Sequence, residues 1–459
     1  MSELIPTQRP LAAIPFSQAL RFWVQLGFIS FGGPAGQIAI MHRELVEKRR
    51  WVSEKRFLHA LNFCMVLPGP EAQQLATYLG WLMHKTRGGV VAGLLFVLPS
   101  LALLILLSWI YLAFGQLPLV AGIFYGIKPA VAAIVLHALH RIARKSLGNP
   151  LLVPVPWAIA ALSFIAIAVF KLPFPVVVLG ALLAGALLAR FAPGALVRGG
   201  RHSSATFAAN APALIDDDTP TPAHAVFTPS RLAAVLAVGA ALWLLPMAAL
   251  FVAYGGNGTL TQIGWFFTKA ALLTFGGAYA VLPYVNQAAV EHYQWLSTAQ
   301  MMDGLALGET TPGPLIMVVA FVGFVGGWVK QVLGPDALFL GAALAACVAT
   351  WFTFLPSFLF ILAGGPWVES TRGNLRLTAP LAAVTAAVVG VMANLALFFI
   401  AAVAYPASAG GGFDAKPDAV ALTLVLLAAL ALWRLQWGVI SVIAASALAG
   451  LALRLMGWA

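Results

Sequence analysis

Uninterrupted apolar runs recur along this chain from one end to the other. Residues 88–115 and 232–254 contain no acidic or basic side chain, and each run can cross the roughly 30 Å hydrocarbon core of a bilayer as a helix. Charged residues make up only 9% of the sequence, against about 25% in soluble proteins. We therefore expect an all-α, polytopic membrane protein in contact with the lipid bilayer. Its thirteen apolar segments are at residues 16–41, 57–84, 88–115, 118–140, 151–171, 173–192, 232–254, 260–285, 301–329, 337–364, 377–402, 417–436 and 437–459.

Rare sequence motifs occur twice and in the same order. Each pair is 244 residues apart, as Pro68 and Pro312 are. The repeated motifs are Phe31-Gly32-Gly33 and Phe275-Gly276-Gly277, Trp51 and Trp295, Ser53 and Ser297, and Pro68-Gly69-Pro70 and Pro312-Gly313-Pro314. Leu98-Pro99-Ser100 and Leu355-Pro356-Ser357 follow at a distance of 257 residues, which places an insertion of 13 residues near 330–339. Internal duplication is characteristic of secondary transporters.

The duplication divides the chain into four parts. We predict an N-terminal transmembrane repeat at residues 1–192, a polar cytoplasmic linker at 193–231, a connecting transmembrane helix at 232–254 and a C-terminal transmembrane repeat at 255–459. The linker is rich in Pro, Ser and Asp, a composition typical of a flexible connection.

Loop charges predict how the repeats are oriented. The loop at 42–56 holds six Lys and Arg residues, and its counterpart at 286–300 holds none. Basic loops stay in the cytoplasm, so equivalent loops face opposite sides and the repeats are inverted. The N-terminus is then cytoplasmic, in a bacterial-type inner (plasma) membrane. The remaining loop charges fit best when the Phe-Gly-Gly and Pro-Gly-Pro segments are re-entrant. The plain alternative is thirteen full crossings, which also inverts the repeats but places Arg141 and Lys145 outside the cell.

The net charge of the chain is +11. In a soluble protein this charge would suggest a nucleic-acid partner, which is not expected here because the basic residues lie in short loops between apolar runs. Membrane orientation accounts for most of the excess, and a basic pathway for an anion is the sharper interpretation. The total charge does not decide between the two.

The two Pro-Gly-Pro motifs interrupt apolar sequence. Proline stops a continuous helix, and a helix that restarts after it presents free N–H groups and the positive end of its dipole, which together bind anions. Two such ends from inverted halves would meet near the midplane, where repeat transporters bind their substrates. A single motif would indicate a structural kink, whereas two at matched positions favour a substrate site. Its residues are Pro68, Gly69, Pro70, Thr310, Thr311, Pro312, Gly313 and Pro314.

Adjacent glycines form the second kind of break. Gly32 and Gly33 in the first half, and Gly276 and Gly277 in the second, allow an unusual backbone and the close approach of a ligand. Close packing between helices is the alternative use of such glycines, and one pair can serve both.

Few ionisable side chains lie inside the apolar segments, and each is a functional candidate. Lys128 and Lys269 are candidates to balance the charge of a bound anion. Glu71 and Glu309, beside the two Pro-Gly-Pro motifs, are candidates for proton coupling, because a buried carboxylate can take up a proton. Structural ion pairs, or side chains that extend to the interface, are the alternatives.

Other polar residues near the breaks are less specific. Gln73 and Gln74 can donate hydrogen bonds to an oxyanion or pair between helices. Arg21, His59 and Asp303 lie near segment ends, where we expect a hydrated membrane interface.

The sequence contains no Walker loop, metal-ligand cluster, nucleophile elbow or dinucleotide fingerprint. We therefore expect neither an enzyme nor a resident cofactor or metal, and no direct drive by ATP.

At these residues the sequence resembles the chromate ion transporter (CHR) family in its long two-domain form. The matching stretches are Ser30–Pro34, Leu67–Gly80, Gly126–Ala130, Thr274–Pro283 and Glu309–Pro314. The resemblance covers nearly the whole chain. One departure is Met65, where the family pattern has a polar residue, so this position is not expected to contact substrate.

The resemblance implies a secondary active transporter that exports chromate from the cytoplasm and confers chromate resistance. Chromate is a tetrahedral dianion shaped like sulfate, which is a second candidate substrate. We expect an antiporter coupled to the proton motive force; a sulfate or other oxyanion importer and a passive anion channel are the alternatives. The sequence leaves the oligomeric state, a homodimer included, open.

Overall fold

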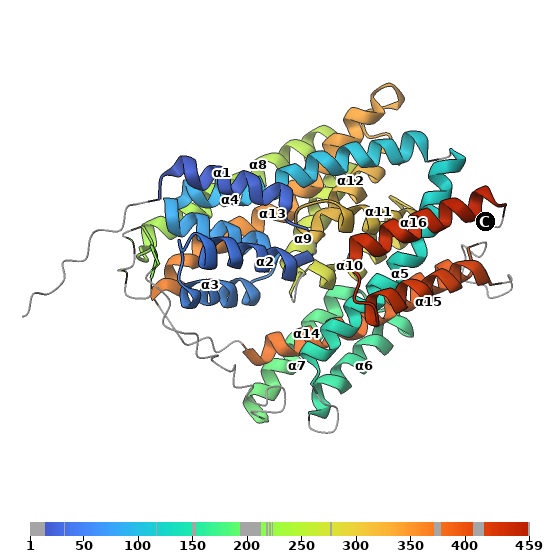
Figure 1. The fold of residues 1–459 in the computed structure, drawn as a ribbon. Coiled ribbons are helices and arrows are strands. Elements are labelled where there is room, and N and C mark those ends of the chain that lie inside the picture. Colours follow the sequence, from blue (N-terminus) through green and yellow to red (C-terminus); the bar gives the residue numbers. More distant parts are fainter. Residues whose placement is uncertain are drawn as a thin grey trace, which may run out of the picture.

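In the computed structural model the chain is almost entirely helical, as the apolar pattern predicts (Figure 1). The structure describes residues 14–31, 33–115, 117–148, 153–192, 213–216, 219, 222, 224–275, 278–370, 378–406 and 417–457. Within these ranges six helices are long and apolar enough to cross a membrane. The all-α, polytopic membrane fold is therefore confirmed.

The N-terminal half contains α1 (Phe16–Ile29), α2 (Gly33–His42), η1 (Arg43–Lys48), α3 (Glu54–Val66), α4 (Glu71–Phe114), α5 (Pro118–Ser146), α6 (Pro154–Ala168) and α7 (Phe174–Phe191). The helix α8 (Pro229–Tyr254) follows. The C-terminal half contains α9 (Thr259–Leu273), α10 (Ala278–Asn286), η2 (Gln287–His292), α11 (Thr298–Thr310), η3 (Leu315–Met317), α12 (Val318–Val329), η4 (Pro335–Ala337), α13 (Leu338–Ser370), α14 (Thr378–Ala404), α15 (Ala419–Trp433) and α16 (Val439–Leu455).

The backbone repeats the same unusual conformations in both halves. Arg50 and Gln294 have φ angles of 50° and 51°, and both follow a short π-helix. Lys171 and Gln436 have φ angles of 52° and 53°, each in the turn between the last two helices of its half. Residues other than glycine rarely adopt positive φ. Their recurrence at matched places shows that the duplication extends to the local backbone.

Each Pro-Gly-Pro motif lies at the tip of a helical hairpin. The rings of Phe63 on α3 and Tyr78 on α4 have centroids 5.7 Å apart, on either side of the first motif. A straight helix would separate these residues by about 22 Å. Gly304 on α11 likewise packs against the ring of Phe321 on α12, across the second motif. The chain therefore turns back at both motifs.

The described segments on either side of each Phe-Gly-Gly motif fold back on one another in the same way. Phe22 on α1 lies 5.8 Å from the ring of Trp51, which follows α2 and η1. Phe266 on α9 lies 4.9 Å from the ring of Tyr284 on α10. Four hairpins, two from each half, thus replace four of the predicted apolar segments.

The long helix α4 contains a further turn. Its backbone leaves the helical region at His84 and Lys85, and Gly80 packs against Gly88 and Ala92 beyond that turn. In the second half the equivalent turn is the longer connection between α12 and α13, at residues 330–337. The sequence comparison places its insertion at the same point.

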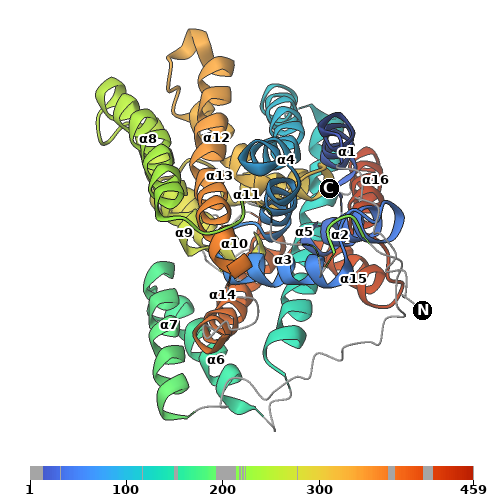
Figure 2. The ribbon, with the colours of Figure 1, turned by 90° about the vertical axis from the view of Figure 1, so that its left-hand side faces the viewer.

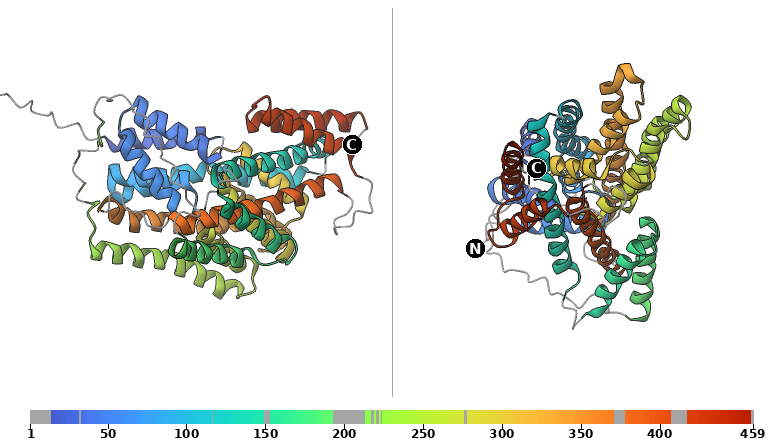
Figure 3. Two further views of the ribbon diagram at one scale, coloured as in Figure 1. Left: turned by 90° about the horizontal axis from the view of Figure 1, so that it is seen from below. Right: turned by 90° about the vertical axis from the view of Figure 1, so that its right-hand side faces the viewer.

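The last two helices of each half are exchanged between the halves. Helix α5 packs against α15 and α16, whereas its counterpart α14 packs against α6 and α7 (Figures 1 and 2). Figure 3 shows the C-terminal pair, in red, beside the teal α5. Gly126 on α5 and Gly390 on α14 approach these pairs so closely that an added Cβ would lie 1.9 Å from a carbonyl oxygen in both places. Small residues thus permit the exchange.

Part of the predicted flexible linker is folded. The Ile215 N–H donates to the Trp51 carbonyl oxygen at 2.9 Å, and the Ser53 N–H donates to the Ile215 carbonyl oxygen at 3.0 Å. Ala225 is fully buried, and His224 Nε2 lies 2.9 Å from the Trp81 carbonyl oxygen. This part of the linker is packed against the N-terminal half: Ile215 docks on the loop that follows η1, and His224 contacts Trp81 on α4. Residues 193–212 lie outside the described part of the chain.

Candidate functional site

The hairpin tips of one half are bonded to those of the other. The Gly69 N–H, in the first Pro-Gly-Pro, donates to the Thr274 carbonyl oxygen at 2.7 Å. The Gly313 N–H, in the second, donates to the Ser30 carbonyl oxygen at 2.9 Å. Each Pro-Gly-Pro tip therefore pairs with the Phe-Gly-Gly tip of the opposite half. In Figure 1, α1 to α3 lie to the left of α9 to α11.

A serine from the opposite half faces each Pro-Gly-Pro glycine. Ser357 on α13 lies beside Gly69, and Ser100 on α4 lies beside Gly313. Both serines are 1% exposed, and neither hydroxyl has a hydrogen-bond partner within the described residues. An unsatisfied buried polar group costs about 1–3 kcal/mol. Two of them at equivalent positions point to a ligand that supplies the missing hydrogen bonds.

Buried glutamines complete the polar lining of the tips. Gln37 Nε2 donates to the Gly313 carbonyl oxygen at 2.5 Å, and Gln74 Nε2 donates to the Pro68 carbonyl oxygen at 2.8 Å. Gln73, one residue earlier, is fully buried as well. The side-chain oxygens of all three lack a partner in the part of the chain that the structure covers. Gln73 and Gln74 were predicted from the sequence, and Gln37 was not.

The two threonine hydroxyls predicted for the site are engaged in their own helix. Thr310 Oγ1 donates to the Ala306 carbonyl oxygen at 3.0 Å, and Thr311 Oγ1 donates to the Gly308 carbonyl oxygen at 3.2 Å. In this conformation neither is free to donate to a ligand.

Helical structure restarts directly after both Pro-Gly-Pro motifs, as predicted. Helix α4 begins after Pro70 and η3 begins after Pro314, and neither N-terminus has a side-chain cap. Glu71 is the first residue of α4, where the positive end of the helix dipole stabilises its carboxylate. Lys145, near the end of α5, interacts electrostatically with Glu71.

Glu309 is buried beside the second Pro-Gly-Pro. The Tyr279 hydroxyl, on α10, donates to Glu309 Oε1 at 2.6 Å. Arg141 on α5 lies over the Tyr279 ring, 5.8 Å from its centroid, and interacts electrostatically with Glu309. A carboxylate, a phenol and a guanidinium from three helices are thus brought together next to the tip.

Lys128 pairs with a residue that the sequence placed elsewhere. Its Nζ lies 3.8 Å from Asp303 Oδ2, and the Tyr111 hydroxyl donates to the same oxygen at 2.8 Å. Asp303 is only 2% exposed, so the prediction that it lies at a hydrated interface is wrong. Helices α4 and α5 both pack against α11, and their side chains Tyr111 and Lys128 enclose this carboxylate.

The remaining predicted residues are less informative. Lys269 is half-buried on α9 and forms no ion pair within the described ranges. Gly33 begins α2 with a φ of 69° and open space beside it. Gly32, Gly276 and Gly277 lie outside the described residues.

Comparison with known proteins adds to this geometry. A family model described as chromate transporter matches residues 17–186 and 261–451. The chain belongs to the chromate transporter family. Each matched stretch of this transporter holds one Phe-Gly-Gly and one Pro-Gly-Pro motif.

Relatives of this transporter cover most of its length. It is 34% identical to the chromate transport protein of Pseudomonas aeruginosa over 440 residues. The aligned residues make up 95% of this chain and 92% of that protein. It is 31% identical over 374 residues to the chromate transport protein of Cupriavidus metallidurans, 81% of this chain and 80% of that one. A match of 164 residues at 28% identity to the uncharacterized transporter YwrA of Bacillus subtilis covers 35% of this chain but 89% of that relative. No solved structure matches the transporter.

Sequence reasoning missed several residues of the tip region in this transporter. In the sequence, Ser100 and Ser357 mark the duplication but were not predicted as site residues. Their repetition within Leu-Pro-Ser was the signal that both serines face equivalent sites. Arg141 was used only to orient a loop. Tyr279 lies two residues beyond the second Phe-Gly-Gly motif, and nothing in the sequence alone relates it to Glu309.

Proposed function

We propose that this transporter exports chromate from the cytoplasm as a secondary active antiporter, and that the meeting point of the hairpin tips is its substrate site. The observation that carries this proposal is the pair of buried, unpartnered hydroxyls of Ser100 and Ser357. Hydroxyls donate hydrogen bonds to oxyanions, and two lie at equivalent positions of the two halves. Export of a dianion is favoured by an inside-negative potential, by about 2.3 kcal/mol per charge per 100 mV.

The same proposal makes the two repeats inverted, with the chain divided as the sequence predicts. The hairpins of the first half have their bases at the basic loop around η1, and those of the second half at the loop around η2, which holds no Lys or Arg. Tip-to-tip hydrogen bonds join the two sets. Bases on opposite membrane faces with tips that meet between them are what inverted repeats produce.

Sulfate is a second candidate substrate of the same site because it shares the shape and charge of chromate. The site contains no feature within the described residues that would separate the two ions by size. Competition between chromate and sulfate, measured in vesicles, distinguishes a selective chromate exporter from a general oxyanion transporter.

Removing the serine hydroxyls tests the site. Ser100→Ala and Ser357→Ala are each expected to raise the KM for chromate about tenfold, the value of one hydrogen bond to a charged group. The thermal unfolding midpoint is expected to stay constant or rise, because each variant removes an unsatisfied polar group from the interior. Loss of stability together with unchanged KM would assign these serines a purely structural role.

Two charged side chains are expected to act in transport: Glu309, beside the second Pro-Gly-Pro, and Lys128, which lines a cavity at the base of the second-half hairpins. Lys128→Ala should lower chromate uptake into everted vesicles at least tenfold, because a cation near the pathway is lost and Asp303 is left buried without its counter-ion. Glu309→Gln keeps the hydrogen bond from Tyr279 but cannot release a proton, so uptake should no longer respond to a pH gradient. Lys330→Ala, on the exposed connection after α12, is the control. Wild-type behaviour of both site variants would contradict these roles.

A further inference from the structure

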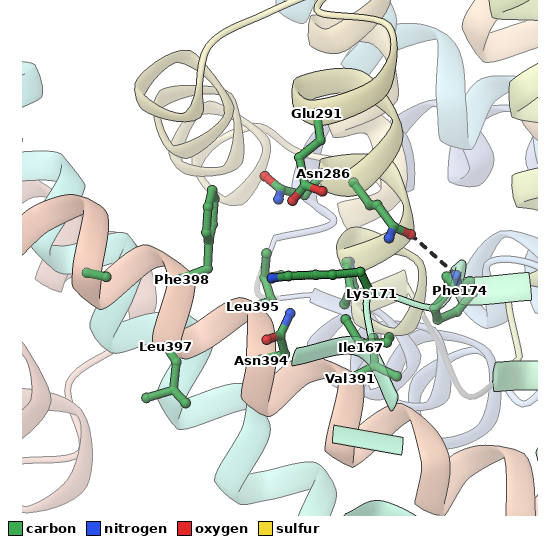
Figure 4. Close-up of a pocket in the computed structure, with 13 residues that line it drawn as sticks. Ile167, Lys171, Phe174, Asn286, Glu291, Val391, Asn394, Leu395, Leu397 and Phe398 are labelled. Atoms are coloured by element: carbon green, nitrogen blue, oxygen red, sulfur yellow. Dashed lines mark hydrogen bonds between the residues drawn. The ribbon is translucent and has the colours of Figure 1, made fainter. Parts of the chain in front are cut away.

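Two cavities of this protein occupy equivalent positions in the two halves. The basic cavity, about 630 Å³, lies between the C-terminal end of α5 and the turn after α15. The neutral cavity, about 370 Å³, lies between the C-terminal part of α14 and the turn after α6 (Figure 4). Each cavity therefore lies where one long helix meets the exchanged helix pair of the other half.

The lining positions confirm this equivalence. Residues 137, 140, 141 and 144 line the basic cavity, and residues 394, 397, 398 and 401, each 257 positions later, line the neutral one. The turns contribute Gln436 and Lys171, the two residues that share a positive φ. The duplication thus supplies one scaffold for both cavities, and only the side chains differ.

The side chains give the cavities opposite electrostatic character. The basic cavity is lined by His137, His140, Arg141, Arg144 and Lys145, and no Asp or Glu is among its lining residues. At four of these positions the neutral cavity has Asn394, Leu397, Phe398 and Ala401.

The neutral cavity has few charges of its own. Lys171 extends into it beside Asn394 and Leu395, and Glu291 lies across it (Figure 4). One cation and one carboxylate leave it without a net charge. The Phe174 N–H donates to Gln287 Oε1 at 3.3 Å at its edge.

We propose that the basic cavity captures the oxyanion on the cytoplasmic side and passes it to the hairpin tips, and that the neutral cavity is the corresponding exit. This inference rests on the proposed function and adds a second anion site and a preferred direction to it. Capture of an anion is favoured where cations raise its local concentration. The difference between the two cavities therefore makes the transporter bind its substrate more readily from the cytoplasm than from outside.

The contacts of the basic cavity connect it to the tips. Arg141 lines the cavity and also lies over Tyr279, which holds Glu309. Lys145 lines the cavity and interacts with Glu71, directly after the first Pro-Gly-Pro. Each carboxylate that flanks a tip thus interacts electrostatically with a cation that lines the cavity.

The cations of the cavity are available for a ligand. Arg144 and Lys145 are exposed, and neither forms an ion pair in the described part of the chain. The rings of His137 and His140 pack edge-on against Trp433, at 5.4 Å and 6.0 Å, and hold that side of the cavity in place. The ligand chemistry is that of an oxyanion, which has two sources here: the free ion in the cytoplasm and the phosphate of a lipid headgroup beside Trp433.

The test measures the KM for chromate separately from each membrane face. Everted vesicles expose the cytoplasmic face and right-side-out vesicles the other. The double variant Arg144→Gln/Lys145→Gln should raise the cytoplasmic KM about fivefold to tenfold per charge at low salt, because each charge attracts a dianion across several ångströms of water. The effect should shrink at high ionic strength. The KM from the outer face should change much less, so the ratio of the two KM values is the readout.

Arg434→Gln is the matched control because it removes a charge from the turn after α15, which borders the cavity, and Arg434 does not line the cavity itself. An unchanged cytoplasmic KM in the double variant, or an equal rise in the control, would overturn the capture site. An effect that disappears in vesicles of uncharged lipid would assign the cavity to a lipid headgroup instead. A wild-type protein that carries no chromate would refute the proposed function itself, which is a different result from a failed capture site.

Discussion

Replacing Gly69 or Gly313 with alanine is expected to abolish chromate transport and to lower the thermal unfolding midpoint. The two glycines have φ angles of 127° and 109°, a backbone conformation that costs other residues about 1–3 kcal/mol. An added Cβ at Gly69 would lie 2.4 Å from Ser357 Oγ, and one at Gly313 would lie 2.7 Å from Ser100 Cβ. Relief of either collision would disturb the hydrogen bonds that join the tips.

The matched control for these variants is Gly180→Ala. Gly180 lies within α7, and an added Cβ there meets open space. Alanine is a better helix former than glycine by about 1 kcal/mol, so this variant should transport normally and unfold no earlier than the wild type. Transport by Gly69→Ala and Gly313→Ala at the rate of the control would show that the tips tolerate displacement.

Glu369→Gln is expected to destabilise the protein by about 3–5 kcal/mol, because it leaves a buried guanidinium without its counter-ion. Arg56 Nη1 lies 2.5 Å from Glu369 Oε2, and the two side chains are 5% and 1% exposed. The Tyr78 hydroxyl donates to the other carboxylate oxygen. This ion pair joins α3 and α4 of the first half to the end of α13 in the second half, so its loss weakens the contact between halves.

Two further variants separate this ion pair from a general effect of charge. Glu47→Gln removes a carboxylate that is 58% exposed beside His42 and should change the stability by less than about 1 kcal/mol. The double variant Arg56→Met/Glu369→Leu should recover much of the loss, because a well-packed apolar pair can replace a buried ion pair. Thermal unfolding in detergent measures all three. Equal midpoints for Glu369→Gln and Glu47→Gln would contradict the assignment.

The breaks in the apolar sequence could be predicted because they are local. Proline and paired glycine interrupt a helix whatever surrounds them, and the structure places a hairpin tip at each Pro-Gly-Pro. The distance between Leu98-Pro99-Ser100 and its copy located the insertion because a duplicated register depends on counting residues, not on packing.

The partners of the site residues could not be predicted because they depend on how the halves pack. Nothing local indicates that Gly69 bonds to Thr274 or that Ser357 faces it, since these residues are far apart in the chain. Asp303 illustrates the same limit. Its place near the start of a segment predicted hydration, but Lys128 and Tyr111 from the other half enclose it.

The flux of chromate into everted vesicles tests the central claim most directly. We predict that everted vesicles that contain the protein accumulate chromate against its concentration gradient, that an imposed pH gradient increases the rate, and that sulfate competes. The Ser100→Ala/Ser357→Ala double variant should require far more chromate for the same rate. Chromate that only equilibrates across the membrane, at a rate indifferent to the pH gradient, would show a passive anion channel and contradict the account.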